Sequence, residues 1–238
     1  MQELSARAAG QGAGRGPIVQ AVRAAKLLTV SSSKGGACKT TTARNLAVIA
    51  AHAGIRVATV DLDAQQTLTI WHKRRPGAAP AIDHRAIPTR DCNDRIAALV
   101  ASGGFDLVIV DTPPGVEGYP AEMRMLVRKS HFCLLTTQQQ SADLDSVIGW
   151  SEIVRREGAR FAFLLSRTFR NRRNYSEAKQ RLIEAGPLCP FDIRDLASVD
   201  RTDKLGVGNI EIRGDLCGED FKGVWRYVSR ELGLGDGE

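Results

Sequence analysis

The chain has 238 residues, of which 43% are hydrophobic and 25% are charged, so it is long enough and apolar enough to bury one large core. These proportions exclude a disordered or fibrous protein, and the longest apolar runs are far shorter than the about 20 residues that span a bilayer. Basic side chains outnumber acidic ones by 33 to 27, and the resulting net charge of +6 permits a polyanionic partner.

The first 25 residues are rich in Ala and Gly and carry no aromatic side chain. We predict a flexible arm over residues 1–25, with a short helix at 18–25. We expect no secretory leader, because no apolar block is followed by a small-residue cleavage site. The five cysteines form neither a CxxC pair nor a metal-binding spacing, so we expect reduced thiols in a cytoplasmic protein.

From residue 26 onward, short β-branched and aliphatic runs alternate with stretches of helical periodicity. The predicted strands cover 27–32, 55–61, 105–111, 132–136 and 161–166, and the predicted helices cover 42–53, 94–102, 143–156 and 176–185. Continuous apolar strands that alternate with helices are typical of a parallel sheet covered on both faces. We therefore predict a single α/β domain over 26–238, a doubly wound and mostly parallel sheet flanked by helices.

The first predicted strand leads directly into the sequence SKGGACKTTT at 33–42, and then into a helix. Gly35 and Gly36 allow a tight turn that presents backbone amides to a phosphate, and the helix N-terminus adds a partial positive charge. Lys39 is placed to reach the β- and γ-phosphates, and the Thr40 hydroxyl to ligate Mg²⁺. The usual phosphate-loop pattern has glycine at 38, where this chain has Cys38.

Two further motifs close predicted strands: VDLDAQQ at 60–66 and VIVDTPPG at 108–115. In an open parallel sheet the carboxyl ends of the strands meet at one crevice, so we expect both motifs and the phosphate loop to surround one ligand. Asp111 follows an apolar run, as expected for the acidic partner of a magnesium shell.

The run from Lys34 to Thr40 resembles the deviant Walker-A motif K-G-G-x-x-K-[ST]. Together with the two strand-end motifs, it resembles the ParA/MinD family of dimerising P-loop ATPases, over roughly residues 26–166. The resemblance implies ATP and Mg²⁺ as cofactors, and slow, partner-stimulated ATP hydrolysis. It also implies a set of nucleotide-contacting residues, namely Gly35, Gly36, Ala37, Cys38, Lys39, Thr40 and Thr41.

The same resemblance implies catalytic roles for Lys34, Lys39 and Asp63. Lys34 would reach across an ATP-sandwich homodimer to the partner's phosphates, and Asp63 would position the attacking water. Asp111 would hold Mg²⁺ through water, beside Thr40.

Because a helix N-terminus and Lys39 both favour a thiolate, we also expect the Cys38 thiol to have a pKa below that of a free thiol.

Residues 155–181 carry nine basic side chains against two acidic ones, a net charge of +7 within 27 residues. Arg170, Arg172 and Arg173 lie in the densest part and suit contacts with a phosphate backbone rather than with base edges. The alternative is an ordinary solvated helix face. We interpret the patch as DNA-binding, as in the ParA-like branch, which binds DNA non-specifically in the ATP state and is nucleoid-associated.

Two alternatives stay open at this point. A MinD-like protein needs a membrane-seeking terminal helix, but we interpret the apolar face over 221–232 as docked on the sheet and expect no stable membrane association. A metabolic P-loop kinase would use the same loop with an acceptor pocket. The sequence leaves open whether the stimulating adaptor is ParB-like or cargo-linked, and whether the cargo is DNA. We interpret His52 and His84 as surface or packing residues.

Overall fold

The structure is a computed structural model, and it describes residues 24–115, 118–195 and 198–235. Six parallel strands form one sheet in the order β3–β2–β4–β1–β5–β6. The strands are β1 (Lys26–Ser31), β2 (Val57–Asp61), β3 (Asp83–Ala86), β4 (Leu107–Asp111), β5 (Phe132–Thr137) and β6 (Phe161–Leu165). The α-helices are α1 (Lys39–His52), α2 (Thr67–Lys73), α3 (Cys92–Ala101), α4 (Pro120–Lys129), α5 (Ser141–Arg156), α6 (Arg173–Ala185), α7 (Ser198–Leu205) and α8 (Leu216–Leu232).

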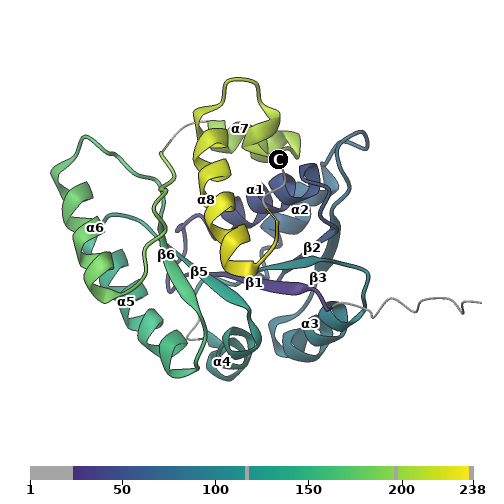
Figure 1. The fold of residues 1–238 in the computed structure, drawn as a ribbon, viewed down its shortest axis with the longest axis horizontal. Coiled ribbons are helices and arrows are strands. Elements are labelled where there is room, and N and C mark those ends of the chain that lie inside the picture. Colours follow the sequence, from purple (N-terminus) through teal and green to yellow (C-terminus); the bar gives the residue numbers. More distant parts are fainter. Residues whose placement is uncertain (1–23, 116–117, 196–197, 236–238) are drawn as a thin grey trace, which may run out of the picture.

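Helices cover both faces of the sheet (Figure 1). One core packs α1, α2 and α8 against one face, and a second core packs α3, α4, α5 and α6 against the other. Strands β2, β4, β5 and β6 are buried at every position, which explains why they read as continuous apolar runs rather than as alternating ones. The predicted fold class, a doubly wound parallel sheet in a single domain, is confirmed.

All five predicted strands are present, with ends within two residues of the prediction, and the predicted helices begin two or three residues earlier than expected. The sequence analysis missed β3, because the segment DHRA is polar and lies half-exposed at the edge of the sheet. It also missed the short helix α2 and the polar helix α4. The predicted N-terminal arm lies almost entirely outside the described residues.

The C-terminal helix α8 packs its apolar face into the core beside α1, as predicted. Phe221, Val224, Trp225, Val228 and Leu232 are all buried there. Within the described ranges, no helix has the length and apolar content to cross a membrane.

Strand register brings the sequence motifs together at the carboxyl edge of the sheet. In β4, Asp111 lies opposite Asp61 of β2 on one side and opposite Val30 of β1 on the other. The loop that leaves β1 therefore starts beside both carboxylates.

Candidate functional site

The loop between β1 and α1 wraps the first turn of α1. Gly36 adopts a φ of 75° and Cys38 a φ of 61°, both in the left-handed region. Gln138, which follows β5, donates a hydrogen bond from Nε2 to the Gly36 carbonyl at 2.9 Å. Because Cys38 is the N-cap of α1 and its side chain makes no capping hydrogen bond, the backbone N–H groups of the first turn remain available to an anion.

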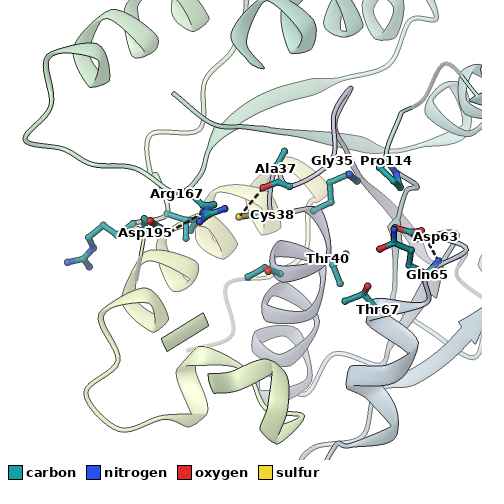
Figure 2. Close-up of a pocket in the computed structure, with 15 residues that line it drawn as sticks. Gly35, Ala37, Cys38, Thr40, Asp63, Gln65, Thr67, Pro114, Arg167 and Asp195 are labelled. Atoms are coloured by element: carbon teal, nitrogen blue, oxygen red, sulfur yellow. Dashed lines mark hydrogen bonds and ion pairs between the residues drawn. The ribbon is translucent and has the colours of Figure 1, made fainter. Parts of the chain in front are cut away.

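A cavity of about 740 Å³ opens in front of this loop, a size suited to a nucleotide. Figure 2 shows Asp63, Gln65, Thr67 and Pro114 on one side of the loop, and Arg167 and Asp195 on the other, with Cys38 between them. All seven predicted contact residues from Gly35 to Thr41 line the cavity, and so does Asp63. Their roles as ligands of a nucleotide stay predictions.

Lys39 supplies a buried positive charge at the floor of the loop. Its side chain is 6% exposed, and Nζ donates to the Lys34 carbonyl at 3.3 Å. Burial lowers the pKa of Lys39, while the nearby carboxylates of Asp111 and Asp63 act in the opposite direction. An ammonium held against a loop carbonyl can turn to a phosphate without leaving the cavity.

Asp111 is 1% exposed, and its Oδ2 accepts a hydrogen bond from the Thr40 hydroxyl at 2.6 Å. Burial raises the pKa of Asp111 to about 7, because desolvation of the carboxylate outweighs the hydrogen bond from Thr40. Among the described residues, none hydrogen-bonds the buried Oδ1. A buried carboxylate oxygen without a donor, next to a threonine hydroxyl, fits the oxygen ligands of Mg²⁺, which keeps several waters and binds one or two protein groups.

The loop after β2 is fixed from below by Asp61, which is 2% exposed. Asp61 Oδ1 accepts from the Asp63 backbone N–H at 3.0 Å, and the Asp63 Oδ1 accepts from the Gln65 N–H at 2.9 Å. The Asp63 side chain is therefore oriented at the cavity wall by the Gln65 N–H, and its backbone is held by Asp61.

Lys34 lies outside the cavity wall. Its Nζ donates to the Ala142 carbonyl at 2.8 Å and lies 3.4 Å from Asp143 Oδ1, both in the first turn of α5. With 43% of its side chain exposed, Lys34 is directed away from the phosphate loop of its own chain. The ammonium groups of Lys34 and Lys39 thus have different surroundings, although the two residues are only five positions apart.

The expectation of a low pKa for Cys38 is wrong. Burial raises the pKa of the Cys38 thiol to about 11, and the cations Arg167, Arg44 and Lys39 offset this only in part. The sulfur lies at the cavity wall, 4.0 Å from the Gly36 carbonyl oxygen, and the cost of desolvating a thiolate there exceeds the stabilisation that the nearby cations provide.

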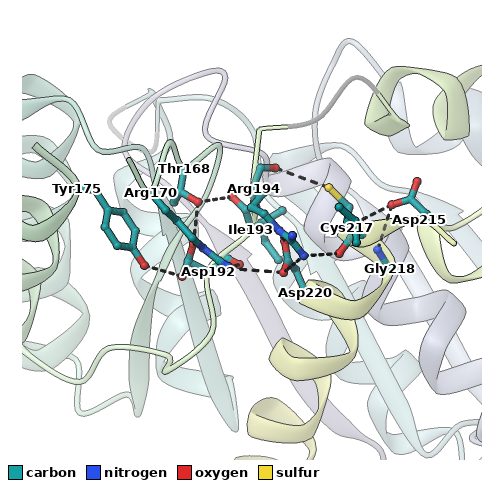
Figure 3. A network of polar contacts seen from close by, with 11 residues as sticks. Thr168, Arg170, Tyr175, Asp192, Ile193, Arg194, Asp215, Cys217, Gly218 and Asp220 are labelled. Atoms are coloured by element: carbon teal, nitrogen blue, oxygen red, sulfur yellow. Dashed lines mark hydrogen bonds and ion pairs between the residues drawn. The ribbon is translucent and has the colours of Figure 1, made fainter. Parts of the chain in front are cut away.

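Arg170 belongs to a network of polar contacts, shown in Figure 3. Its Nε donates to Asp192 Oδ2 at 3.0 Å, and its Nη2 lies 3.6 Å from Asp220 Oδ1. Thr168 and Tyr175 also donate to Asp192, at 2.6 and 2.9 Å. Arg170 therefore ties the loop between β6 and α6 to the segment around Asp192 and to α8, a contact that the sequence analysis did not anticipate.

The other two predicted DNA contacts are freer. Arg172 stacks over the Phe169 ring at 4.2 Å, and Arg173 forms an exposed ion pair with Glu177 at 3.2 Å, of a kind worth little in water. The structure also splits the basic run, because Arg155 and Arg160 lie before β6 while Arg170, Arg172 and Arg173 follow it. Their proposed contact with DNA stays a prediction.

Sequence reasoning missed one wall of the cavity, formed by Ile193, Arg194 and Asp195. This segment follows α6 in irregular structure and carries no motif. Arg167 pairs with Asp195 at 3.1 Å and lines the same wall. Gln138 was also missed, although its place directly after β5 is a signal that the strand-end rule could have used.

Comparison with known proteins agrees with this geometry. Residues 28–206 match the family model described as the CobQ/CobB/MinD/ParA nucleotide binding domain. The chain is 32% identical over 214 residues to the maintenance of carboxysome distribution protein A of Gloeobacter kilaueensis, covering 87% of this chain and 94% of the relative. The chain therefore belongs to the CobQ/CobB/MinD/ParA nucleotide-binding family.

Two solved structures share the fold. The septum site-determining protein MinD of Pyrococcus horikoshii, complexed with Mg-ADP, superposes with a TM-score of 0.72 at 17% identity over 87% of this chain and 96% of that one. An aspartate-to-alanine variant of McdA from Cyanothece, complexed with ATP, superposes with a TM-score of 0.70 at 18% identity over 89% and 97%. Their bound nucleotides, and the Mg²⁺ in the first, agree with the cofactors that the sequence predicts.

Replacing Cys38 tests the left-handed backbone of the loop. Glycine usually destabilises relative to alanine by about 0.5–1 kcal/mol, but a left-handed φ costs a residue with a Cβ about 1–2 kcal/mol. We therefore expect Cys38→Gly to have a larger free energy of unfolding than Cys38→Ala, measured by chemical denaturation. A Cys38→Ala variant more stable than Cys38→Gly would contradict the assigned conformation.

The rate of thiol labelling tests the raised pKa. Below a pKa of about 11 the thiolate fraction of Cys38 grows tenfold per pH unit, so alkylation at Cys38 should accelerate about tenfold per unit from pH 7 to 9. Peptide mapping separates Cys38 from the other four thiols, which are fully buried. A rate that levels off below pH 8 would restore the low pKa.

Proposed function

We propose that the chain is a ParA-like ATPase that binds Mg²⁺ and ATP, forms an ATP-sandwich homodimer and hydrolyses ATP slowly. One observation carries the proposal. Lys39, Thr40 and Asp63 line a single cavity, with Asp111 bonded to Thr40, while Lys34 of the same loop points out of it. A phosphate loop whose lysine only points into the cavity would suit a monomeric enzyme equally well. The outward Lys34 is therefore what favours a dimer.

Within one protomer, each group has a distinct task. Lys39 and the N–H groups of the first turn of α1 bind the phosphates. Thr40 and Asp111 would hold Mg²⁺, and the bound ion would neutralise part of the negative charge on the phosphate groups. Asp63, held by its own backbone contacts, orients the attacking water, so the chain contributes mainly positioning and charge.

Lys34 couples nucleotide state to dimerisation. Its present partners are a carbonyl and a half-exposed carboxylate of α5, and exposed ion pairs of this kind contribute about 0–1 kcal/mol. The phosphates of a partner's nucleotide, with more negative charge, can therefore displace Asp143. Loss of the γ-phosphate on hydrolysis removes that competitor, and the dimer loosens.

The cargo branch of this family fits the chain best. The relative at 32% identity is named for maintaining carboxysome distribution, which favours the positioning of a cellular body over plasmid partition. In the ATP state, Arg172 and Arg173 would contact nucleoid DNA without reading its sequence. A cargo-linked adaptor would stimulate hydrolysis, in a cytoplasmic and nucleoid-associated cycle. Because the apolar face of α8 is buried in the core, that helix is not available as a MinD-like membrane anchor.

Three single variants test the sandwich. Lys39→Ala removes the main phosphate cation and should weaken nucleotide binding by about 100-fold, since hydrogen bonds to charged groups contribute about 1.5–3 kcal/mol. Lys34→Ala should bind ATP normally and stay monomeric. Asp63→Ala should accumulate as the ATP dimer, as measured by sedimentation.

Lys222→Ala is the matched control, because Lys222 is likewise exposed and ion-paired, with Glu219. It should behave as the parent protein. Normal ATP-dependent dimerisation of Lys34→Ala would remove the sandwich from the proposal.

The DNA surface is tested by the double variant Arg172→Ala/Arg173→Ala. Its binding to random DNA in the presence of ATP should weaken, and the salt dependence should lose a slope of roughly two, because two phosphate contacts disappear. ATP affinity should not change. Gel shifts with ATP, ADP and no nucleotide also separate the switch from a metabolic kinase, which has no ATP-dependent affinity for DNA.

The matched control removes two exposed charges elsewhere, in Arg95→Ala/Lys129→Ala. Arg170→Ala is not a clean test, because it removes a partner of Asp192 and should lower stability by about 1 kcal/mol. Equal DNA affinity of the Arg172/Arg173 variant and the control variant would locate the DNA surface elsewhere.

A further inference from the structure

A hydrogen-bonded chain of side chains lies behind the loop that carries Asp63. Its centre is the buried Asp61 carboxylate, which accepts three hydrogen bonds. Oδ1 accepts from the Asp63 N–H at 3.0 Å, and Oδ2 accepts from the Thr69 N–H at 2.9 Å and from the Thr69 hydroxyl at 2.8 Å. One carboxylate thus fixes both the start of the Asp63 loop and the first turn of α2.

This series of hydrogen bonds continues from Thr69 to His84 in the edge strand β3. Thr69 Oγ1 lies 2.9 Å from His84 Nε2, and Thr59 Oγ1 lies 2.9 Å from His84 Nδ1. The single proton of the Thr69 hydroxyl points to Asp61, so Thr69 must accept from His84, and Nε2 carries the imidazole proton. Nδ1 is then the acceptor on this side, and it shares the Thr59 hydroxyl, at 2.9 Å, with the Asp83 carbonyl oxygen at 3.2 Å. The links from His84 through Thr69 to Asp61 therefore have a defined direction.

We propose that His84 is a positioning residue for Asp63. By donating from Nε2, His84 keeps the Thr69 hydroxyl turned toward Asp61, and Asp61 holds the backbone of Asp63 at the cavity wall. His84 does not line the cavity itself and acts through Thr69 and Asp61. The proposal rests on the proposed function, because it concerns the residue that orients the attacking water.

The surroundings of His84 keep its ring neutral. Its ring stacks on His72 of α2, with centroids 4.8 Å apart, and Lys73 and Arg85 add positive charge nearby. Burial and these groups lower the pKa of His84 to about 4, although Asp61 lies one hydroxyl away. In neutral solution Nε2 therefore keeps the single ring proton, and the direction of the links from His84 through Thr69 to Asp61 is fixed.

The His84 ring can affect the rate of hydrolysis although it does not line the cavity, because a small displacement of Asp63 is enough. Geometry at a reacting centre is demanding, since a misplacement of about 1 Å can cost about 100-fold in rate. Without the donor at Nε2, the Thr69 hydroxyl is free to turn toward another acceptor, and Asp61 keeps only two of its three donors. The carboxylate can then rotate, and the Asp63 N–H moves with it.

Two amide substitutions separate the two ring nitrogens. In His84→Gln the terminal amide reaches the place of Nε2 and can donate to Thr69. In His84→Asn the shorter amide reaches only the place of Nδ1 and contacts Thr59. We expect His84→Asn to lower kcat for ATP hydrolysis about tenfold with KM within about twofold of the parent value, and His84→Gln to recover most of kcat.

A second pair tests the same link from its other end and does not depend on β3. Thr69→Val keeps the shape of the side chain and removes the hydroxyl, so it should match His84→Asn. Thr69→Ser keeps the hydroxyl and should behave as the parent. His52→Asn, at an exposed histidine of α1, is the control for loss of an imidazole and should change nothing.

Hydrogen exchange of the Asp63 amide provides a measurement that does not require turnover. Its protection should fall in His84→Asn and Thr69→Val and persist in His84→Gln and Thr69→Ser. A parent protein that hydrolyses no ATP would end the proposed function, and the exchange rates would still decide the positioning. Equal kcat and equal protection in His84→Asn and His84→Gln, whether both fall or neither does, would overturn the proposal.

Discussion

The register of three neighbouring strands, β2, β4 and β1, is the constraint on which the site depends. It sets Asp111 beside Asp61 and starts the loop after β1 two residues beyond Val30. Because side chains alternate between the two faces of a strand, a slip of β4 by one residue would turn Asp111 away from Thr40 and exchange the residues of the two cores. Burial of both faces by helices therefore holds the polar edge in place as firmly as the apolar interior.

The two buried carboxylates at that edge show how a protein separates structure from binding. Asp61 has a donor for each oxygen and three in total, so its charge is satisfied by the fold alone. Asp111 has one donor, from Thr40, and an oxygen that the described residues leave without a hydrogen bond. The Asp61 carboxylate organises a loop, and the Asp111 carboxylate has a buried oxygen whose charge a cation can neutralise.

The parts predicted from sequence are those in which neighbouring residues determine the outcome. Buried strands, the glycine-rich turn and the acidic strand ends all follow from residue types that stand next to one another. The errors concern partners that lie far along the chain. Burial of Cys38, the pairing of Arg170 with Asp192 and Asp220, and the bonds of His84 to Thr59 and Thr69 depend on how separate elements pack. His84, interpreted as a surface or packing residue, shows how little a lone histidine reveals before its neighbours are known.

The two edges of the sheet are closed in different ways. At one edge β3 is short and carries the ion-paired charges of Asp83 and Arg85. At the other, the backbone of β6 is hydrogen-bonded to the segment around Pro187, Cys189 and Ile193. The segment beside β6 occupies the backbone groups at that edge, and the short, charged β3 offers a strand of another molecule little length to pair with. Filaments or larger assemblies of this protein would therefore have to grow through its helices and loops, so that their geometry could change by surface substitution without disturbing the sheet.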